Sequence, residues 1–151
     1  MPAISITRLE LRGYRFLPSF FIHTYRSQNQ LVAAPGYVAG GTAMESLRAF
    51  WTVTCWQSLD AMRVFRNAGA HLKAMRRLID ICCAAAYTHF EQDSTELPTL
   101  EQAHARMLAE GKLSKVRFPS ALQESGRTAT DKIPKGWRPA KPRPQLAATK
   151  A

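Results

Sequence analysis

The chain has 151 residues, 46% of them hydrophobic, which suits one globular domain with a sizeable core. Its formal net charge of +10 invites a nucleic-acid function, but seven Lys and Arg against a single Asp within residues 126–151 supply +6 of that charge. The preceding residues are only mildly basic, so we expect no sequence-specific nucleic-acid binding.

The chain begins with a predicted strand followed by a predicted helix. Residues 4–12, ISITRLELR, alternate apolar and polar side chains with one phase slip near Thr7 and Arg8, which indicates a strand with a bulge. The pattern then becomes helical over residues 15–32, with Pro18 in the first turn. One stripe of this helix carries Phe16, Phe20, His23, Thr24, Ser27 and Leu31.

Two further strands are predicted next. Residues 37–44 contain Gly40 and Gly41, which indicate a bend or the close approach of another group. Residues 49–56, AFWTVTCW, are rich in β-branched and aromatic side chains and give the strongest strand pattern of the chain. Ser58 then suits the N-cap of a helix that begins at residue 59.

A glycine, Gly69, interrupts that helix and a second one follows. His71 begins an otherwise apolar stripe of this helix, continued by Met75, Leu78 and Cys82. Residues 84–92 form a fourth predicted strand in which Tyr87, His89 and Glu91 share one face.

The remaining elements are a peripheral helix, an edge strand and a tail. Thr99 and Gln102 form a capping box, and Gly111 suits the helix end. Residues 115–118 suit a short edge strand. We expect residues 121–151 to form a flexible, basic, Pro-rich tail, because this segment has no sustained apolar period to offset its ordering entropy. Such a tail is able to contact phosphates or acidic partners, with Trp137 stacking on a base, or to act only as a solubilising extension.

The order of elements predicts an α+β fold, a ferredoxin-like βαββαβ unit over residues 4–120 with helices on one face of an antiparallel sheet. The other sheet face then needs a cover, and pairing of two copies into a homodimer is the economical solution.

No segment has the length and apolar character of a secretory signal or a membrane span. The cysteines Cys55, Cys82 and Cys83 are odd in number and lack a CxxC spacing, which favours a reducing, cytoplasmic compartment. We expect all three to be small core residues.

The segments FWTVTCWQSLDAMRVFRNAGAHLKAM, YTHFEQ and LPTLEQAHARMLAEGKLSKVRFPS resemble the dimeric α/β-barrel superfamily that includes antibiotic-biosynthesis monooxygenases. RFLPSFF, APG, FWTVTCW and GAHLKAM look more closely like spheroidene-monooxygenase-like proteins and their relatives. The resemblance implies a dimeric α/β barrel and a pocket between sheet and helices. Trp56 and His71 match the aromatic residue and the histidine that contribute to this pocket in the superfamily.

The resemblance also implies two kinds of chemistry. Some members oxidise aromatic polyketides without metal or flavin, and others bind or degrade heme, with which spheroidene monooxygenase is associated. Heme-degrading members use an Asn, Trp and His set; here Phe65 stands at the Trp-like position and the first strand offers no matching Asn.

These observations predict a monooxygenase-like protein for a small hydrophobic or aromatic compound. His71 and Trp56 are the candidate catalytic residues, and His71 is the candidate metal ligand where heme is bound. The cofactor is either heme or none. The candidate binding residues are Phe20, His23, Phe65, Met75 and His89.

Several alternatives to this function stay open at the level of sequence. His71 is also explained as a helix-start histidine bonded to the backbone, and Trp56 as a core aromatic. The whole protein is also explained as a non-enzymatic ligand- or heme-binding module. The sequence lacks HExxH, GxSxG and GxxxxGK[ST] motifs, which disfavours metalloprotease, hydrolase and nucleotide-dependent activities.

Overall fold

The computed structural model describes residues 1–144, and residues 145–151 of the predicted tail lie outside this range. One antiparallel sheet organises the chain, in the strand order β5-β4-β1-β3-β2-β6. Its central order, β4-β1-β3-β2, is that of a ferredoxin-like unit, so the predicted α+β fold is confirmed. The strands are β1 (Ala3–Leu11), β2 (Tyr37–Met44), β3 (Ala49–Trp56), β4 (Cys82–Glu91), β5 (Lys112–Leu113) and β6 (Lys135–Pro139).

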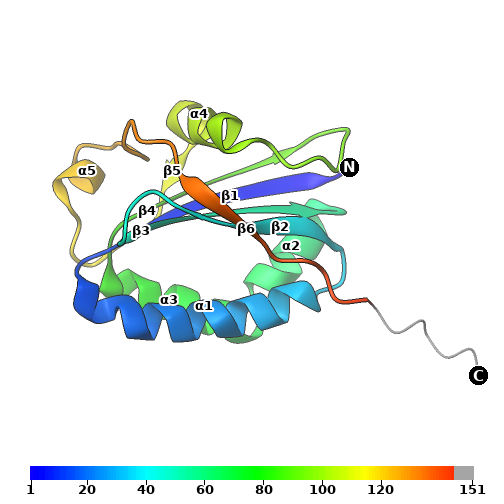
Figure 1. The fold of residues 1–151 in the computed structure, drawn as a ribbon, viewed down its shortest axis with the longest axis horizontal. Helices are drawn as coiled ribbons and strands as arrows, with labels where there is room; N and C mark the ends of the chain where they lie inside the picture. The colour runs from blue at the N-terminus through cyan, green and yellow to red at the C-terminus, as the bar shows by residue number, and fades with distance from the viewer. Residues whose placement is uncertain (145–151) are drawn as a thin grey trace, which may run out of the picture.

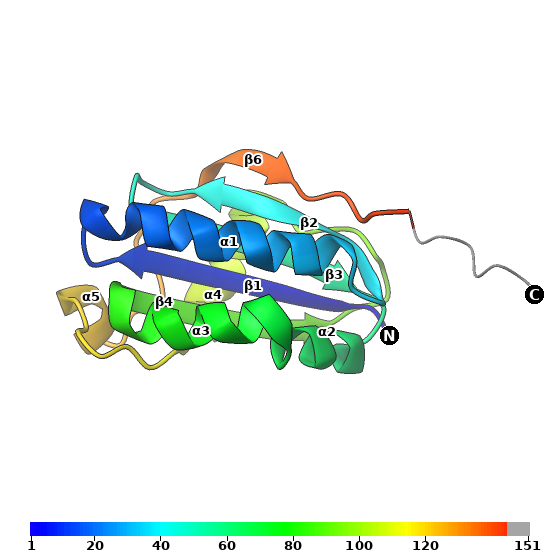
Figure 2. The ribbon, with the colours of Figure 1, turned by 90° about the horizontal axis from the view of Figure 1, so that it is seen from below.

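Helices cover both faces of the sheet, as Figure 1 shows. Three lie on one face: α1 (Leu17–Val32), preceded by the 3-10 turn η1 (Tyr14–Phe16), α2 (Leu59–Arg66) and α3 (Gly69–Ile81). In Figure 2, α1 and α3 run side by side across this face. The helix α4 (Leu100–Glu110) lies on the opposite face, and the short α5 (Ala121–Glu124) lies at one end.

Local signals in the sequence account for several of these boundaries. The Ser58 side chain accepts a hydrogen bond from the Ala61 amide at the start of α2, and Thr99 and Gln102 form the predicted capping box of α4. Gly69 has a φ of +58°, a left-handed conformation that a side chain would strain, and this residue separates α2 from α3.

Two boundaries differ from the prediction. The irregularity falls between Glu10 and Leu11 in the pairing of β1 with β4, not near Thr7 and Arg8. Glu10 pairs with Ala84 and Leu11 with Cys82, so the extra residue is on β4. Leu11 keeps the alternation of β1 and packs in the cluster with Phe20 and Ile81. The edge strand is Lys112–Leu113 rather than residues 115–118, where the Arg117 amide donates to the Ile79 carbonyl and Val116 packs beside the same cluster.

The predicted flexible tail is wrong for its described part, residues 121–144. β6 pairs with β2, the Ala140 amide donates to the Gly40 carbonyl at 2.8 Å, and Ala129 is fully buried in the core. The physical reason is that β2 would otherwise present an unpaired edge, and pairing satisfies the backbone of a segment that has little apolar surface of its own.

The sheet face opposite α1 and α3 is covered within the chain, so the argument that it needs a second copy is wrong. Ala103 and Met107 of α4 pack on Ile4, Trp51 and Val53 of the sheet. This cover satisfies the burial requirement that we had assigned to pairing. Homodimerisation itself stays a prediction.

A buried ion pair lies under this cover. The Arg8 guanidinium donates to both carboxylate oxygens of Glu45, at 2.9 and 2.7 Å, and the Trp51 indole donates to Glu45 at 3.1 Å. Burial alone would raise the pKa of Glu45, but its hydrogen bonds with Arg8 and the Arg8 charge lower it. The pair therefore stays ionised inside the fold.

Candidate functional site

A band of polar side chains crosses the middle of the sheet on the side that faces α1 and α3. Opposite residues of neighbouring antiparallel strands point to the same face, and Ser5 pairs with both Thr54 and His89. Thr7 pairs in the same way with Thr52 and Tyr87. We call this set the polar band: Ser5, Thr7, Thr52, Thr54, Tyr87 and His89.

Apolar clusters flank the polar band at both ends and show which way it faces. Ala3 and Trp56, one row beyond Ser5 and Thr54, pack with Leu31 of α1 and Met62 of α2. At the other end Phe50 stacks on Phe20 of α1, with ring centroids 4.6 Å apart. Since side chains alternate along a strand, every second residue between these clusters faces the helices too. These residues are the polar band.

Five of the six side chains in the polar band are only half-buried, although helices cover this face; the exception is Thr54, which is 7% exposed. Within residues 1–144, Thr54 alone of the band has a hydrogen bond to another side chain, from the Trp56 indole at 3.0 Å. The band therefore keeps unused hydrogen-bonding groups between two apolar clusters, which is the composition of a small-molecule site.

The helix α1 brings further polar groups to the same layer. His23 and Ser27 lie on the stripe between the buried Phe20 and Leu31. The Ser27 hydroxyl is buried and finds no hydrogen-bond partner among the described residues. A buried hydroxyl without a partner costs free energy, which a bound ligand would recover.

Aromatic rings form one wall next to the band. Trp56 lies 5.5 Å from the Tyr37 ring and 5.1 Å from the Phe65 ring, measured between centroids, and Phe65 lies 4.6 Å from the His71 ring. We call Tyr37, Trp56, Phe65 and His71 the aromatic cluster. It joins β2 and β3 to the helices α2 and α3.

His71 is held in place by contacts from two other segments. Its backbone amide donates to the Gln30 side-chain oxygen at 2.8 Å, and its Nδ1 lies 3.2 Å from the Arg66 carbonyl oxygen. A carbonyl oxygen only accepts, so in the neutral ring this contact places the proton on Nδ1 and the lone pair on Nε2. Nε2 is then available as a base or as a ligand.

His71 and His89 are neutral at neutral pH. Burial lowers the pKa of His71, and the Arg66 charge lowers it further against the opposing backbone hydrogen bond. Burial, with the charges of Arg66, Arg63 and Lys112, lowers the pKa of His89 to about 4. Two neutral imidazoles beside cationic side chains are able to accept a proton from an acidic ligand and to stabilise the anion that results.

The residues predicted from sequence divide over this layer rather than forming one pocket. Trp56, Phe65 and His71 lie together in the aromatic cluster, and His89 lies in the polar band. Phe20 lies at the far end against Phe50, His23 lies between, and Met75 is 40% exposed on α3.

Sequence reasoning missed the hydroxyl side chains of the polar band. The signal that could have found them is the alternation along two strands. Thr52 and Thr54 alternate with buried residues, and Ser5 and Thr7 alternate with isoleucines.

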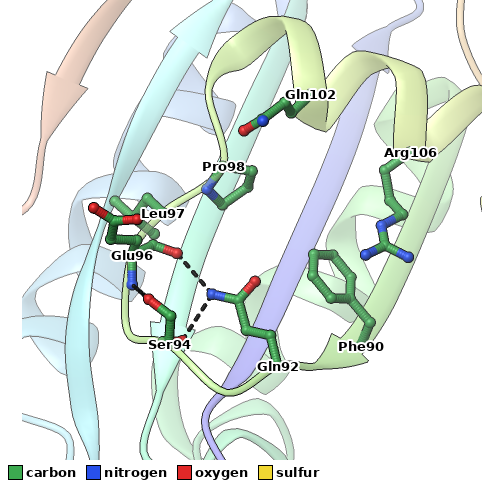
Figure 3. A pocket seen from close by; sticks show the side chains of 8 residues that line it. All are labelled: Phe90, Gln92, Ser94, Glu96, Leu97, Pro98, Gln102 and Arg106. Carbon is green, nitrogen blue, oxygen red and sulfur yellow. Dashed lines mark hydrogen bonds between the residues drawn. The ribbon is translucent and has the colours of Figure 1, made fainter.

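Two surface hollows lie outside the polar band. One, of about 560 Å³, lies between the end of α1 and α2, and its wall includes Gln30 and Phe65, two of the residues that contact His71. The other, of about 340 Å³, lies where β4 leads into α4 (Figure 3). There Gln92 donates to the Ser94 and Glu96 carbonyls, and Arg106 lies over the Phe90 ring. His71 itself does not line the first hollow.

No protein-family model matches this sequence, and a search of curated proteins finds no match. Solved structures do match. SnoaB, a cofactor-independent oxygenase from Streptomyces nogalater, is 16% identical with a TM-score of 0.52, over 62% of this chain and 95% of SnoaB. This chain therefore shares the fold of SnoaB.

Two further structures agree with this fold. Rv0793 from Mycobacterium tuberculosis is 14% identical with a TM-score of 0.56, over 64% of this chain and 100% of its own. A protein of Nitrosomonas europaea assigned by name to the antibiotic biosynthesis monooxygenases is 9% identical with a TM-score of 0.55, over 61% of this chain and 90% of its own. At these identities the likeness establishes a shared fold, and it confirms the resemblance at that level.

Within residues 1–144, no group of three or more His, Cys, Asp or Glu side chains is placed to hold a metal ion. Over the same residues, every helix is too short or too polar to cross a membrane.

Proposed function

We propose that this protein is a monooxygenase-like enzyme that binds a small hydrophobic or aromatic compound between the sheet and the helices α1 and α3. The observation that carries the proposal is the polar band, a half-buried set of hydrogen-bonding side chains between two apolar clusters. The fold shared with SnoaB, a cofactor-independent oxygenase, supports the same type of reaction. The closer resemblance to spheroidene-monooxygenase-like proteins stays a prediction.

The residues of the site suit a substrate that carries an acidic hydroxyl on an aromatic ring. The neutral His89 or His71 takes the hydroxyl proton, and the positive charges of Arg63 and Arg66 favour the anion. The electron-rich anion then reacts with O2. For a ring CH2 converted to a carbonyl, one oxygen atom enters the product and the other leaves as water, so the substrate supplies all the electrons.

The proposal is tested by O2 uptake with a panel of hydroxyaromatic compounds, with a chelator present and no cofactor added. We expect uptake to fall about a hundredfold or more in His89→Gln or His71→Ala, the range for losing a general base. His104→Asn is the matched control, because the His104 ring contacts the Thr130 carbonyl on the opposite side of the sheet. Equal rates in all four proteins would contradict the proposal.

Heme binding is the second candidate function, and the tautomer of His71 is the observation that favours it. A histidine that donates from Nδ1 to a backbone carbonyl keeps Nε2 free for iron, which is how proteins commonly orient such ligands. Heme would supply O2 activation in an enzyme, or would itself be the ligand of a non-enzymatic module.

An absorption spectrum with added hemin separates these cases. A Soret shift that His71→Ala abolishes assigns His71 as the axial ligand. Identical spectra for both proteins remove His71 from that role and leave the cofactor-free reaction or packing as its function.

A further inference from the structure

The outward side of α1 carries large apolar side chains in water. Phe21, Ile22 and Tyr25 are 53%, 52% and 68% exposed, and their spacing of one, three and four residues places them on one stripe. Tyr14, in the turn before α1, is 61% exposed. A contiguous exposed patch of this kind marks an interaction surface, because soluble surfaces seldom gather large apolar side chains.

Exposed cations surround these side chains. Arg15, in the turn η1 before α1, and Arg26, on α1, flank them, and residues 11–44 contain no Asp or Glu. The helix α3, side by side with α1 in Figure 2, exposes Lys73, Arg76 and Arg77. Its one acidic residue, Asp80, pairs with Arg117 at 3.1 Å. Arg15, Phe21, Ile22, Tyr25, Arg26, Lys73, Arg76 and Arg77 form what we call the basic-aromatic face.

We propose that the basic-aromatic face docks this protein onto an anionic lipid membrane surface. Charge complementarity selects the partner, because five exposed Lys and Arg side chains meet no exposed carboxylate on α1 or α3. The apolar stripe selects lipid over nucleic acid. Phe21 and Ile22 lie between Arg15 and Arg26 in the sequence. Apolar and aromatic side chains of this kind insert at the boundary between headgroups and acyl chains, while neighbouring cations contact the lipid phosphates.

Docking by this face goes beyond the proposed function and does not depend on it. It places α1 and α3, the two helices that cover the polar band, against the lipid (Figure 1). An apolar compound dissolved in the bilayer then has the shortest path to that layer. Vesicle binding is measured without substrate and tests only the membrane docking. O2 uptake is measured without vesicles and tests only the proposed function, so failure of one proposal is distinguishable from failure of the other.

The test is co-sedimentation of the full chain with vesicles of phosphatidylcholine containing 30% phosphatidylglycerol, and with phosphatidylcholine alone. We expect binding to the anionic vesicles that weakens with salt. Because each cation at such a surface contributes a factor of about five, Arg76→Glu/Arg77→Glu lowers the partition coefficient at least about 25-fold. Phe21→Ser/Tyr25→Ser lowers it as well, without a change in charge.

The matched control is Lys132→Glu/Lys135→Glu, which changes the net charge equally at exposed positions outside α1 and α3. This variant retains binding if the face is specific, and equal losses in both charge variants overturn the proposal. Unchanged vesicle binding by Phe21→Ser/Tyr25→Ser also overturns the proposal. So does weak binding to vesicles that single-stranded RNA competes away. Circular dichroism confirms that each variant is folded.

Discussion

His89 carries no charge at neutral pH, because burial and the cations Arg66, Arg63 and Lys112 hold its pKa at about 4. In the unfolded chain the same imidazole takes up a proton as the pH falls through about 6.5. The folded protein resists that protonation. The stability that depends on a neutral His89 is therefore complete above pH 6.5 and is lost progressively between pH 6.5 and 4.

This loss of stability with falling pH gives a prediction for His89→Gln. Between pH 6.5 and 4 the free energy of unfolding of the wild-type protein should fall by about 1–2 kcal/mol more than that of the variant, after allowing for partial exposure of the ring. Urea denaturation at both pH values measures the difference. Parallel pH profiles would show that His89 is not held neutral, and an NMR titration of its ring protons decides the point directly.

The buried pair of Arg8 and Glu45 gives a second prediction. Arg8→Met leaves a carboxylate buried at 4% side-chain exposure without its partner, and should cost about 3–5 kcal/mol of unfolding free energy. The double variant Arg8→Met/Glu45→Leu removes both charges and should be more stable than Arg8→Met. Thermal denaturation of the three proteins checks this order, and a double variant no better than the single one would contradict it.

Single residues were predictable from sequence where the signal is local. The caps Ser58 and Thr99 needed only their neighbours along the helix. The contacts that fix His71 were not predictable, because Gln30 lies 41 residues away and its position depends on how α1 crosses the sheet. The same holds for the ring order of the aromatic cluster.

At the scale of elements, β6 depends on a glycine in the strand beside it. A side chain on Gly41 would lie 2.4 Å from the Arg138 carbonyl oxygen and 2.7 Å from the Trp137 ring. Gly41→Val should therefore detach β6, and the amides of Ala140 and Arg143 should exchange with deuterium much faster. The control is Gly13→Val, where the backbone is extended and no atom lies within 4 Å of the added carbon. Unchanged exchange in Gly41→Val would contradict this role.

Most elements were predictable because hydrophobic period and capping agree within each segment. The order of β1, α1, β2, β3, α2, α3 and β4 follows from such patterns. β6 was missed for a physical reason: Lys135–Pro139 has no buried residue, and its stability comes from the backbone edge of β2. Composition alone made this segment resemble an unstructured tail.

At the scale of the whole molecule, cover of both sheet faces within one chain changes where a dimer can form. α4 and Ala129 occupy the face through which pairing was expected, so a homodimer has to use another surface or displace α4. We retain homodimerisation as a prediction, to be checked by light scattering on the purified protein. A monomer at high concentration would exclude it.

The central claim is that a hydrophobic aromatic ligand binds at the polar band, between the sheet and the helices α1 and α3. The most direct test is an NMR titration of methyl-labelled protein with 1-naphthol in the absence of oxygen. We predict shifts in the methyl signals of Thr7, Thr52 and Thr54, and none in those of Ala103 and Met107 on the opposite face. Shifts confined to the α4 side, or no shifts at ligand saturation, would contradict the account.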